Sequence, residues 1–291
     1  MTSLNQQITL QDARKLGFNE YGPANGTPLF YFHGSPSARI EFCLFGNDTL
    51  LDELNIRLVA PDRPGNGLSD FQPDRKMMDW PADISALADH LNLDRFAILG
   101  YSGGGPYAAA CALSIPERIT RAGIVSGTAP FVIPGLADNI NKDSRNFMDL
   151  SHQKPWLSRT ILRMMGLMTR LMPDKVIANA LAALPEPDQA TVAFPEVQQG
   201  FLSMIQEALR SGPRGAQHDT RLMVTEWDFM PEKIQMPVWL WHGEEDKNAP
   251  IAMGRYMANA ISKSQAKFYP GEGHLSLFKK YAKEIIQTLA G

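Results

Sequence analysis

The sequence predicts an α/β fold in which a mostly parallel sheet is covered by helices on both faces. Two observations predict it. Short, continuously apolar runs alternate with segments of helical periodicity, which is typical of parallel strands joined by helices. The alternation stops between residues 131 and 232, where every segment is helix-like, and it resumes afterwards. This interruption predicts a helical cap inserted into one α/β core.

The chain begins with a predicted hairpin formed by residues 8–10 and 15–21, which flank a polar turn. The strands that follow are runs of four to six apolar residues, of the kind found in strands that are buried on both faces. These runs cover residues 28–33, 56–61, 96–100, 122–126, 238–242 and 266–270.

Helical periodicity fills the intervals between the strands. Residues 79–91 place Trp80, Ile84 and Leu87 on one stripe, and similar patterns cover residues 103–113, 251–261 and 275–289. The interrupting stretch carries eight of the 21 prolines and eight of the fourteen methionines. We therefore assign residues 1–130 and 233–291 to the core and residues 131–232 to the cap.

Composition excludes several functional classes. The chain has 291 residues and a formal net charge of −3, which disfavours nucleic acid as a partner because phosphate backbones require a basic face. Two cysteines are too few for a disulfide-stapled secreted scaffold. No signal peptide or membrane-spanning run is apparent, so we expect a cytoplasmic protein without a membrane partner. The oligomeric state, monomer or homodimer, stays open.

The strongest motif is Gly100-x-Ser102-x-Gly104, which lies between a buried strand and an Ala-rich helix. A nucleophile presented on so sharp a turn needs small neighbours, and the following helix N-terminus favours a developing oxyanion. A phosphate-binding turn is the alternative, but the motif lacks the lysine of a P-loop and the glycine spacing of a dinucleotide site. Ser102 is therefore the predicted nucleophile.

A serine nucleophile needs a base and a carboxylate that orients the base. His274 lies in a turn between the last strand and the last helix, and Asp246 follows the strand 238–242. Glu244 and Glu245 are adjacent alternatives to Asp246. His242 is expected to be structural, and no histidine spacing suggests a metal site, so no metal is predicted. His90, His152 and His218 are expected on the surface.

The segment after the strand 28–33 supplies the remaining element of the predicted site. Its Ser35 amide is expected to form an oxyanion hole together with the amide of Gly103. His33 is expected to brace this loop rather than to transfer protons. Candidate substrate contacts are Tyr101, beside the nucleophile, and Trp227 and Phe229, near the second junction of core and cap, although packing explains these three residues as well.

Together these motifs resemble the α/β-hydrolase superfamily. The resemblance implies a mainly parallel eight-stranded sheet with a site under the cap, and it implies that Ser102, Asp246, His274 and the amides of Ser35 and Gly103 carry catalysis without a cofactor. Dehalogenase and epoxide-hydrolase relatives have Asp at the nucleophile position, so Ser102 disfavours both activities. The matching segments are residues 33–36, 62–69, 100–104, 243–246 and 271–274.

The leading functional hypothesis is a serine hydrolase that acts on a small, largely apolar carboxylic ester. Relatives with the same residues hydrolyse C–C bonds, lactones or amides, or release N-terminal residues from peptides. The last activity requires cap carboxylates that bind an amine, for which Glu186, Asp188, Glu196 and Glu207 are available. A ligand-binding receptor that retains the fold is the hypothesis from a different class.

Overall fold

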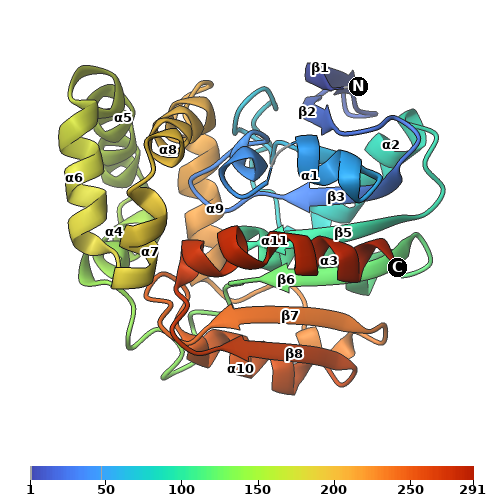
Figure 1. Cartoon of the computed structure of the whole chain (residues 1–291). Coiled ribbons are helices and arrows are strands. Elements are labelled where there is room, and N and C mark those ends of the chain that lie inside the picture. The colour runs from blue at the N-terminus through green and yellow to red at the C-terminus, as the bar shows by residue number, and fades with distance from the viewer. Residues whose placement is uncertain (1, 47) are drawn as a thin grey trace.

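Eight strands form one sheet in the order β1-β2-β4-β3-β5-β6-β7-β8 (Figure 1). The structure is a computed structural model that describes residues 2–46 and 48–291. β1 pairs with β2 and β2 with β4 in antiparallel fashion, and the remaining pairs are parallel. The strands are β1 (Ser3–Thr9), β2 (Lys15–Tyr21), β3 (Thr27–Phe32), β4 (Ile56–Pro61), β5 (Phe96–Tyr101), β6 (Ile119–Val125), β7 (Val238–Gly243) and β8 (Ser264–Tyr269).

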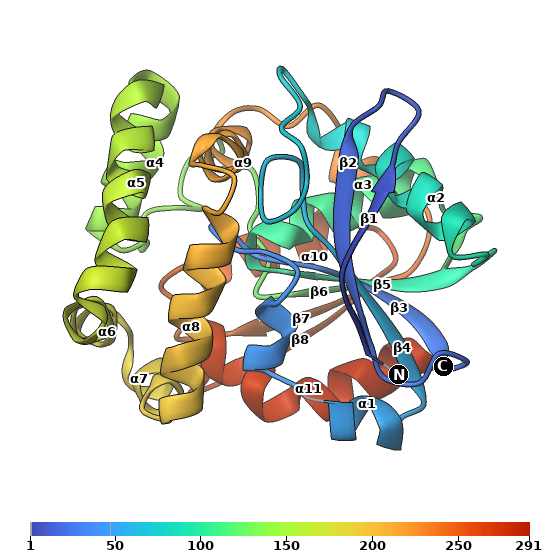
Figure 2. The same cartoon turned by 90° about the horizontal axis from the view of Figure 1, so that it is seen from above.

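Helices cover both faces of the sheet, as the sequence predicts. Figure 2 shows α1 (Asp48–Glu53) and α11 (His274–Ala290) on one side and α2 (Trp80–His90) and α3 (Gly105–Ser114) on the other. α10 (Ile251–Ala260) joins the same buried cluster as α2 and α3. The central strand β5 is buried along its whole length, which explains its uninterrupted apolar sequence.

Six helices lie between β6 and β7, at the edge of the sheet toward which the parallel strands run (Figure 1). They occupy residues 142–224, within the range 131–232 that the sequence assigns to a cap. They are α4 (Lys142–Gln153), α5 (Pro155–Leu171), α6 (Pro173–Ala183), α7 (Glu186–Val192), α8 (Pro195–Ala208) and α9 (Arg214–Val224).

The eight-stranded α/β architecture is confirmed, with a difference at each edge. The last strand, β8, is mostly exposed, although its sequence predicts burial, because only one neighbouring strand covers this edge of the sheet. β1 begins at Ser3, whereas the sequence predicts a strand only from Ile8. Most side chains of this edge strand are exposed, so backbone pairing with β2 defines the strand and an apolar pattern does not. Among the described residues, we find no helix long and apolar enough to cross a membrane.

Candidate active site

Ser102 lies on a sharp turn between β5 and α3. Its φ of +52° is in the left-handed region, which a non-glycine residue rarely occupies. The turn closes only because its flanking residues lack side chains: a Cβ on Gly100 would lie 2.5 Å from the Gly104 carbonyl oxygen, and one on Gly104 would lie 2.1 Å from that of Phe32. The spacing of the glycines is therefore a steric requirement of the turn.

His274 and Asp246 meet beyond the carboxyl ends of β8 and β7. The imidazole Nδ1 lies 2.7 Å from Asp246 Oδ2, and both side chains are buried. Burial opposes a charge on His274, but the adjacent carboxylate outweighs it and raises the pKa of His274 above its usual value. The other Asp246 oxygen accepts hydrogen bonds from the amides of Asn248 and Ala249, at 2.8 Å each, which fixes the carboxylate.

The structure distinguishes Asp246 from its neighbours in the same turn. Glu244 instead forms an ion pair at 3.3 Å with the exposed Arg255. His242 lies below the turn, with Nε2 2.6 Å from the Ala249 carbonyl oxygen and 3.6 Å from Asp246 Oδ2, so it supports the carboxylate from the strand side.

Tyr101 connects the Ser102 turn to His274. Its hydroxyl donates a hydrogen bond of 3.2 Å to the His274 carbonyl oxygen, and its ring centroid lies 5.1 Å from the imidazole. The ring also packs against Phe45 and Phe278 in the core. These contacts describe a packing residue that holds the nucleophile strand beside the histidine.

The Ser35 segment lies across the turn from Gly103. A Cβ on Gly103 would be 3.4 Å from the Ser35 amide nitrogen and 3.1 Å from Met223 Sδ of α9. Among the described residues, the buried Ser35 hydroxyl has no hydrogen-bond partner. Buried hydroxyl groups nearly always have a hydrogen-bond partner, so this one is an exception.

His33 and Arg63 fix this segment from behind. His33 Nδ1 donates to the Gly34 carbonyl oxygen at 2.8 Å, and its Nε2 accepts from the Arg63 amide at 3.1 Å. The Arg63 guanidinium donates to the carbonyl oxygens of both His33 and Gly34. It also pairs with Asp219 of α9, which holds Arg75 as well.

Glu41, in a short 3-10 helix (η1, Glu41–Leu44), is a carboxyl group that sequence reasoning missed. Its Oε2 accepts hydrogen bonds of 2.7 Å from the Tyr31 hydroxyl and from the Gly34 amide. Burial raises the pKa of Glu41, although both donors oppose this effect. The sequence offers one signal, a charged residue inside an apolar stretch directly after the loop 33–36.

Asp188 of α7 is a second missed residue. The sequence predicts it only as one of several carboxylates of the cap, yet it is completely buried. Its carboxylate accepts hydrogen bonds from the amides of His274, Leu275 and Ser276, at 2.8–2.9 Å. It thereby caps the N-terminus of α11 and fixes the backbone that carries His274.

The two aromatic candidates Trp227 and Phe229 stack on each other, with ring centroids 5.2 Å apart, and belong to the buried cluster beneath α2 and α3. Packing is the role that these contacts describe. The expectation that His218 is exposed is wrong: it is buried, and its Nε2 lies 2.9 Å from the Arg75 carbonyl oxygen. Its helix α9 turns this polar face toward the core.

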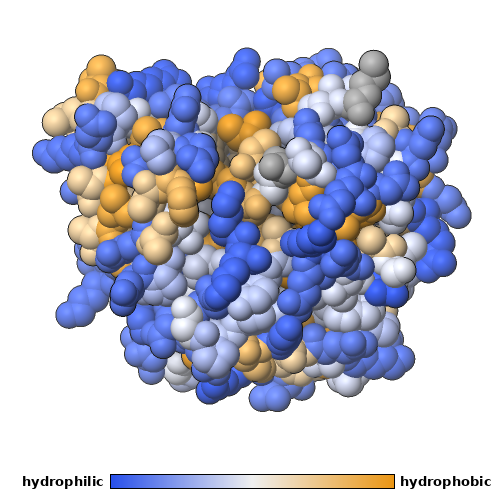
Figure 3. Space-filling model, in the orientation of Figure 1, coloured by the Kyte–Doolittle hydropathy of each residue, from blue (hydrophilic) through white to orange (hydrophobic). Residues whose placement is uncertain are grey.

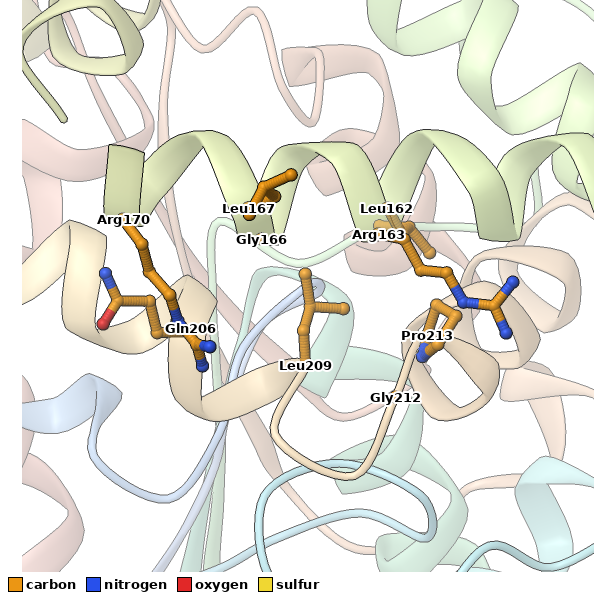
Figure 4. Close-up of a pocket in the computed structure, with 9 residues that line it drawn as sticks. All are labelled: Leu162, Arg163, Gly166, Leu167, Arg170, Gln206, Leu209, Gly212 and Pro213. Atoms are coloured by element: carbon orange, nitrogen blue, oxygen red, sulfur yellow. The ribbon is translucent and has the colours of Figure 1, made fainter. Parts of the chain in front are cut away.

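A recess of about 240 Å³ lies between α5 and the segment from α8 to α9 (Figure 4). Leu162, Leu167 and Leu209 give it an apolar floor, and Arg163 and Arg170 flank it. Ser102 and His274 are not among its lining residues, so it is separate from the site described above. Within residues 2–46 and 48–291, we find no group of three histidine, cysteine or acidic side chains that could hold a metal ion.

Comparison with known proteins places this geometry in a family. The family model described as alpha/beta hydrolase fold matches residues 27–281. The chain is 31% identical to a non-heme chloroperoxidase of Streptomyces lividans and 25% identical to a bifunctional esterase/perhydrolase of Acinetobacter calcoaceticus. Each match covers 92% of this chain and 92% of the relative.

Solved structures agree on the fold. A hydrolase from Pseudomonas aeruginosa PA01 superposes with a TM-score of 0.71 at 18% identity, covering 99% of this chain and 98% of the other. An esterase from Rhodococcus sp. ECU1013 gives a TM-score of 0.68 at 20% identity, with the same coverage. The match of the family model across most of the chain shows that this protein belongs to the α/β-hydrolase family.

Proposed function

We propose that this protein is a serine hydrolase that cleaves small, largely apolar carboxylic esters, with Ser102, His274 and Asp246 as its catalytic residues. The observation that carries the proposal is the buried His274–Asp246 pair, 2.7 Å apart, at the sheet edge where Ser102 occupies a strained turn. The esterase named among the relatives supports the same class of reaction.

In this mechanism, Nδ1 of His274 faces Asp246, which leaves Nε2 to take the proton of Ser102. Ser102 Oγ attacks the ester carbonyl, and the amides of Ser35 and Gly103 stabilise the oxyanion. The alcohol leaves with the proton from His274. Water, deprotonated by the same imidazole, then releases the acid and restores Ser102.

We further propose that residues 131–232 act as a cap over this site. Two helices of that segment contribute side chains at its border: α9 supplies Met223 beside Gly103, and α7 supplies Asp188 beneath His274. The flexible thioether of Met223 suits an apolar acyl group of variable shape.

A Ser102→Ala variant tests the mechanism. Hydrolysis of p-nitrophenyl acetate and butyrate should fall at least about 10³-fold, because only binding and oxyanion contacts remain. Ser262→Ala, which alters an exposed serine, is the matched control and should keep full activity. Unchanged turnover in Ser102→Ala would exclude the mechanism. Tight ligand binding without labelling by a fluorophosphonate probe would instead favour a receptor.

Perhydrolysis is a second candidate, which the two named relatives support, an esterase/perhydrolase and a non-heme chloroperoxidase. Hydrogen peroxide would replace water in the second half-reaction. It would attack the acyl-Ser102 carbonyl, lose a proton to His274 and release a peracid, while Ser102 regains its proton. Peracid formation from an acetate ester with peroxide, abolished in Ser102→Ala, is the expected result. Hydrolysis without peracid formation would support the esterase activity only.

Release of N-terminal residues from peptides is less well supported. That reaction needs free carboxylates that bind the substrate amine. Asp188 is occupied by three backbone amides, and Glu207 forms an ion pair with Arg39 at 2.7 Å. Glu186 and Glu196 are exposed to solvent. An aminoacyl anilide should therefore be a poorer substrate than an ester of the same size.

A further inference from the structure

Glu41 and Ser102 lie on either side of Gly34. A Cβ placed on Gly34 would be 3.0 Å from Glu41 Oε1 and 3.6 Å from Ser102 Oγ. The carboxyl group and the nucleophile therefore both border the space that a side chain at position 34 would fill. A carboxyl group that is nearly inaccessible to solvent and so close to the reacting hydroxyl calls for a functional explanation.

The hydrogen bonds around Gly34 determine the direction of the Ser35 amide. Arg63 holds the carbonyl oxygen of His33, Glu41 holds the amide of Gly34, and Arg63 and His33 together hold the carbonyl oxygen of Gly34. In a trans peptide the N–H points away from the preceding C=O. The Ser35 N–H is thus directed away from Arg63, and it has no partner among the described residues.

Glu41 also joins Asp246 and Asp188 as a carboxyl group whose charge acts on His274. Asp246 contacts Nδ1, and Asp188 of α7 accepts from the His274 amide. The other ionisable groups nearby are His242 behind Asp246, Tyr101 against the imidazole, and Glu272, which pairs with Lys280 at 2.5 Å. Two cations face this arrangement: Arg63, behind Gly34, lowers the pKa of Glu41, and Lys279 donates to the Leu44 carbonyl oxygen at the end of η1.

We infer that Glu41 is a positioning residue of this site: it holds the His33–Gly34 peptide, which leads directly into the Gly34–Ser35 peptide whose amide faces an oxyanion, and it places a negative charge beside the space that Ser102 borders. The inference rests on the proposed function for its catalytic meaning. The negative charge favours the imidazolium that forms when Ser102 loses its proton. Among the groups that raise the pKa of His274, Glu41 accompanies Asp246 and Asp188.

The effect of the Glu41 charge on the pKa of His274 is tested by NMR titration of the imidazole in the full chain. Glu41→Gln keeps an oxygen that can accept from Gly34 and Tyr31 but removes the charge, so the pKa of His274 should fall by about half a unit to one unit. Asp83→Asn is the matched control. Asp83 is a buried carboxylate of α2, away from the site, and it pairs with Arg14. It should leave the His274 titration unchanged.

The positioning role of Glu41 is tested by ester turnover. Glu41→Ala removes the acceptor of the Gly34 amide, so kcat should fall about 10- to 100-fold while KM changes by less than about threefold. Glu41→Gln should restore most of kcat and shift the acid limb of kcat/KM to lower pH. Where Glu41→Ala does not fold, Tyr31→Phe loosens the same carboxyl group but keeps its charge, so kcat should fall with the His274 pKa unchanged.

Two results would overturn the inference. One is a His274 titration in Glu41→Gln that coincides with that of Asp83→Asn. The other is full kcat in Glu41→Ala or, if that variant does not fold, in Tyr31→Phe. Failure of the proposed function looks different: the wild-type chain would neither hydrolyse esters nor react with a fluorophosphonate, while the NMR comparison would still report the charge of Glu41.

Discussion

The sheet core and the helices between β6 and β7 are held together by different means. The core buries large apolar side chains on both faces of the sheet. The segment 131–232 instead contains nine of the ten large apolar residues that are exposed among the described residues, including Trp156 and Leu171 at 68% and 67% exposure. Figure 3 shows hydrophobic side chains gathered over α5 to α8.

Carboxylates attach this segment to the core. Asp219 of α9 binds Arg63 and Arg75, Glu207 of α8 binds Arg39, and Asp188 of α7 binds the first turn of α11. Two of these anchors end at the site itself, since Arg63 holds the Ser35 segment and α11 begins with His274. The helices are thus positioned in two ways: apolar residues such as Val192, Ile205 and Met223 join the buried clusters of the core, and a few polar contacts fix the segment at the active-site border.

Removal of the Asp219 charge should therefore have the largest effect on stability. Asp219→Asn leaves two buried guanidinium groups without their carboxylate, which should lower the free energy of unfolding by about 3–5 kcal/mol in urea denaturation. Asp149→Asn is the control, because Asp149 pairs with Arg145 on the exposed face of α4 and should cost under about 0.5 kcal/mol. Equal losses in both variants would contradict the anchoring role.

A leucine-to-alanine substitution in each region compares the stability contributed by a buried leucine with that contributed by an exposed one. Leu99 of β5 is completely buried, so Leu99→Ala should cost about 2–5 kcal/mol of unfolding free energy. Leu171, at the end of α5, is two-thirds exposed, so Leu171→Ala should change stability by less than about 0.5 kcal/mol. A large loss from Leu171→Ala would mean that this face is covered in solution, which size measurements by light scattering would reveal.

This contrast also explains what the sequence could predict. The strands β3 to β7 are recognisable because each is a largely buried apolar run, whereas the edge strand β8 is mostly exposed. The predictions for Ser102, Asp246 and His274 follow from turns at the strand ends. Glu41 and Asp188 could not be assigned in this way, because a single carboxylate has no periodic pattern, whether it lies in an apolar stretch, as Glu41 does, or among polar residues, as Asp188 does. Glu41 accepts from a backbone amide 7 positions away, and Asp188 accepts from amides 86–88 positions away along the chain. Only the folded structure brings these groups together.

The anchoring model predicts a smaller and more local effect at Asp188 than at Asp219. Asparagine retains one acceptor oxygen, and its amide group would face the backbone N–H donors of α11, so Asp188→Asn should lower the free energy of unfolding by about 2 kcal/mol. Glu186→Gln alters an exposed carboxylate of the same helix and should have almost no effect. Because α11 begins at His274, the loss in Asp188→Asn should be accompanied by slower ester hydrolysis, whereas a stability loss with unchanged kcat would assign Asp188 to helix capping alone.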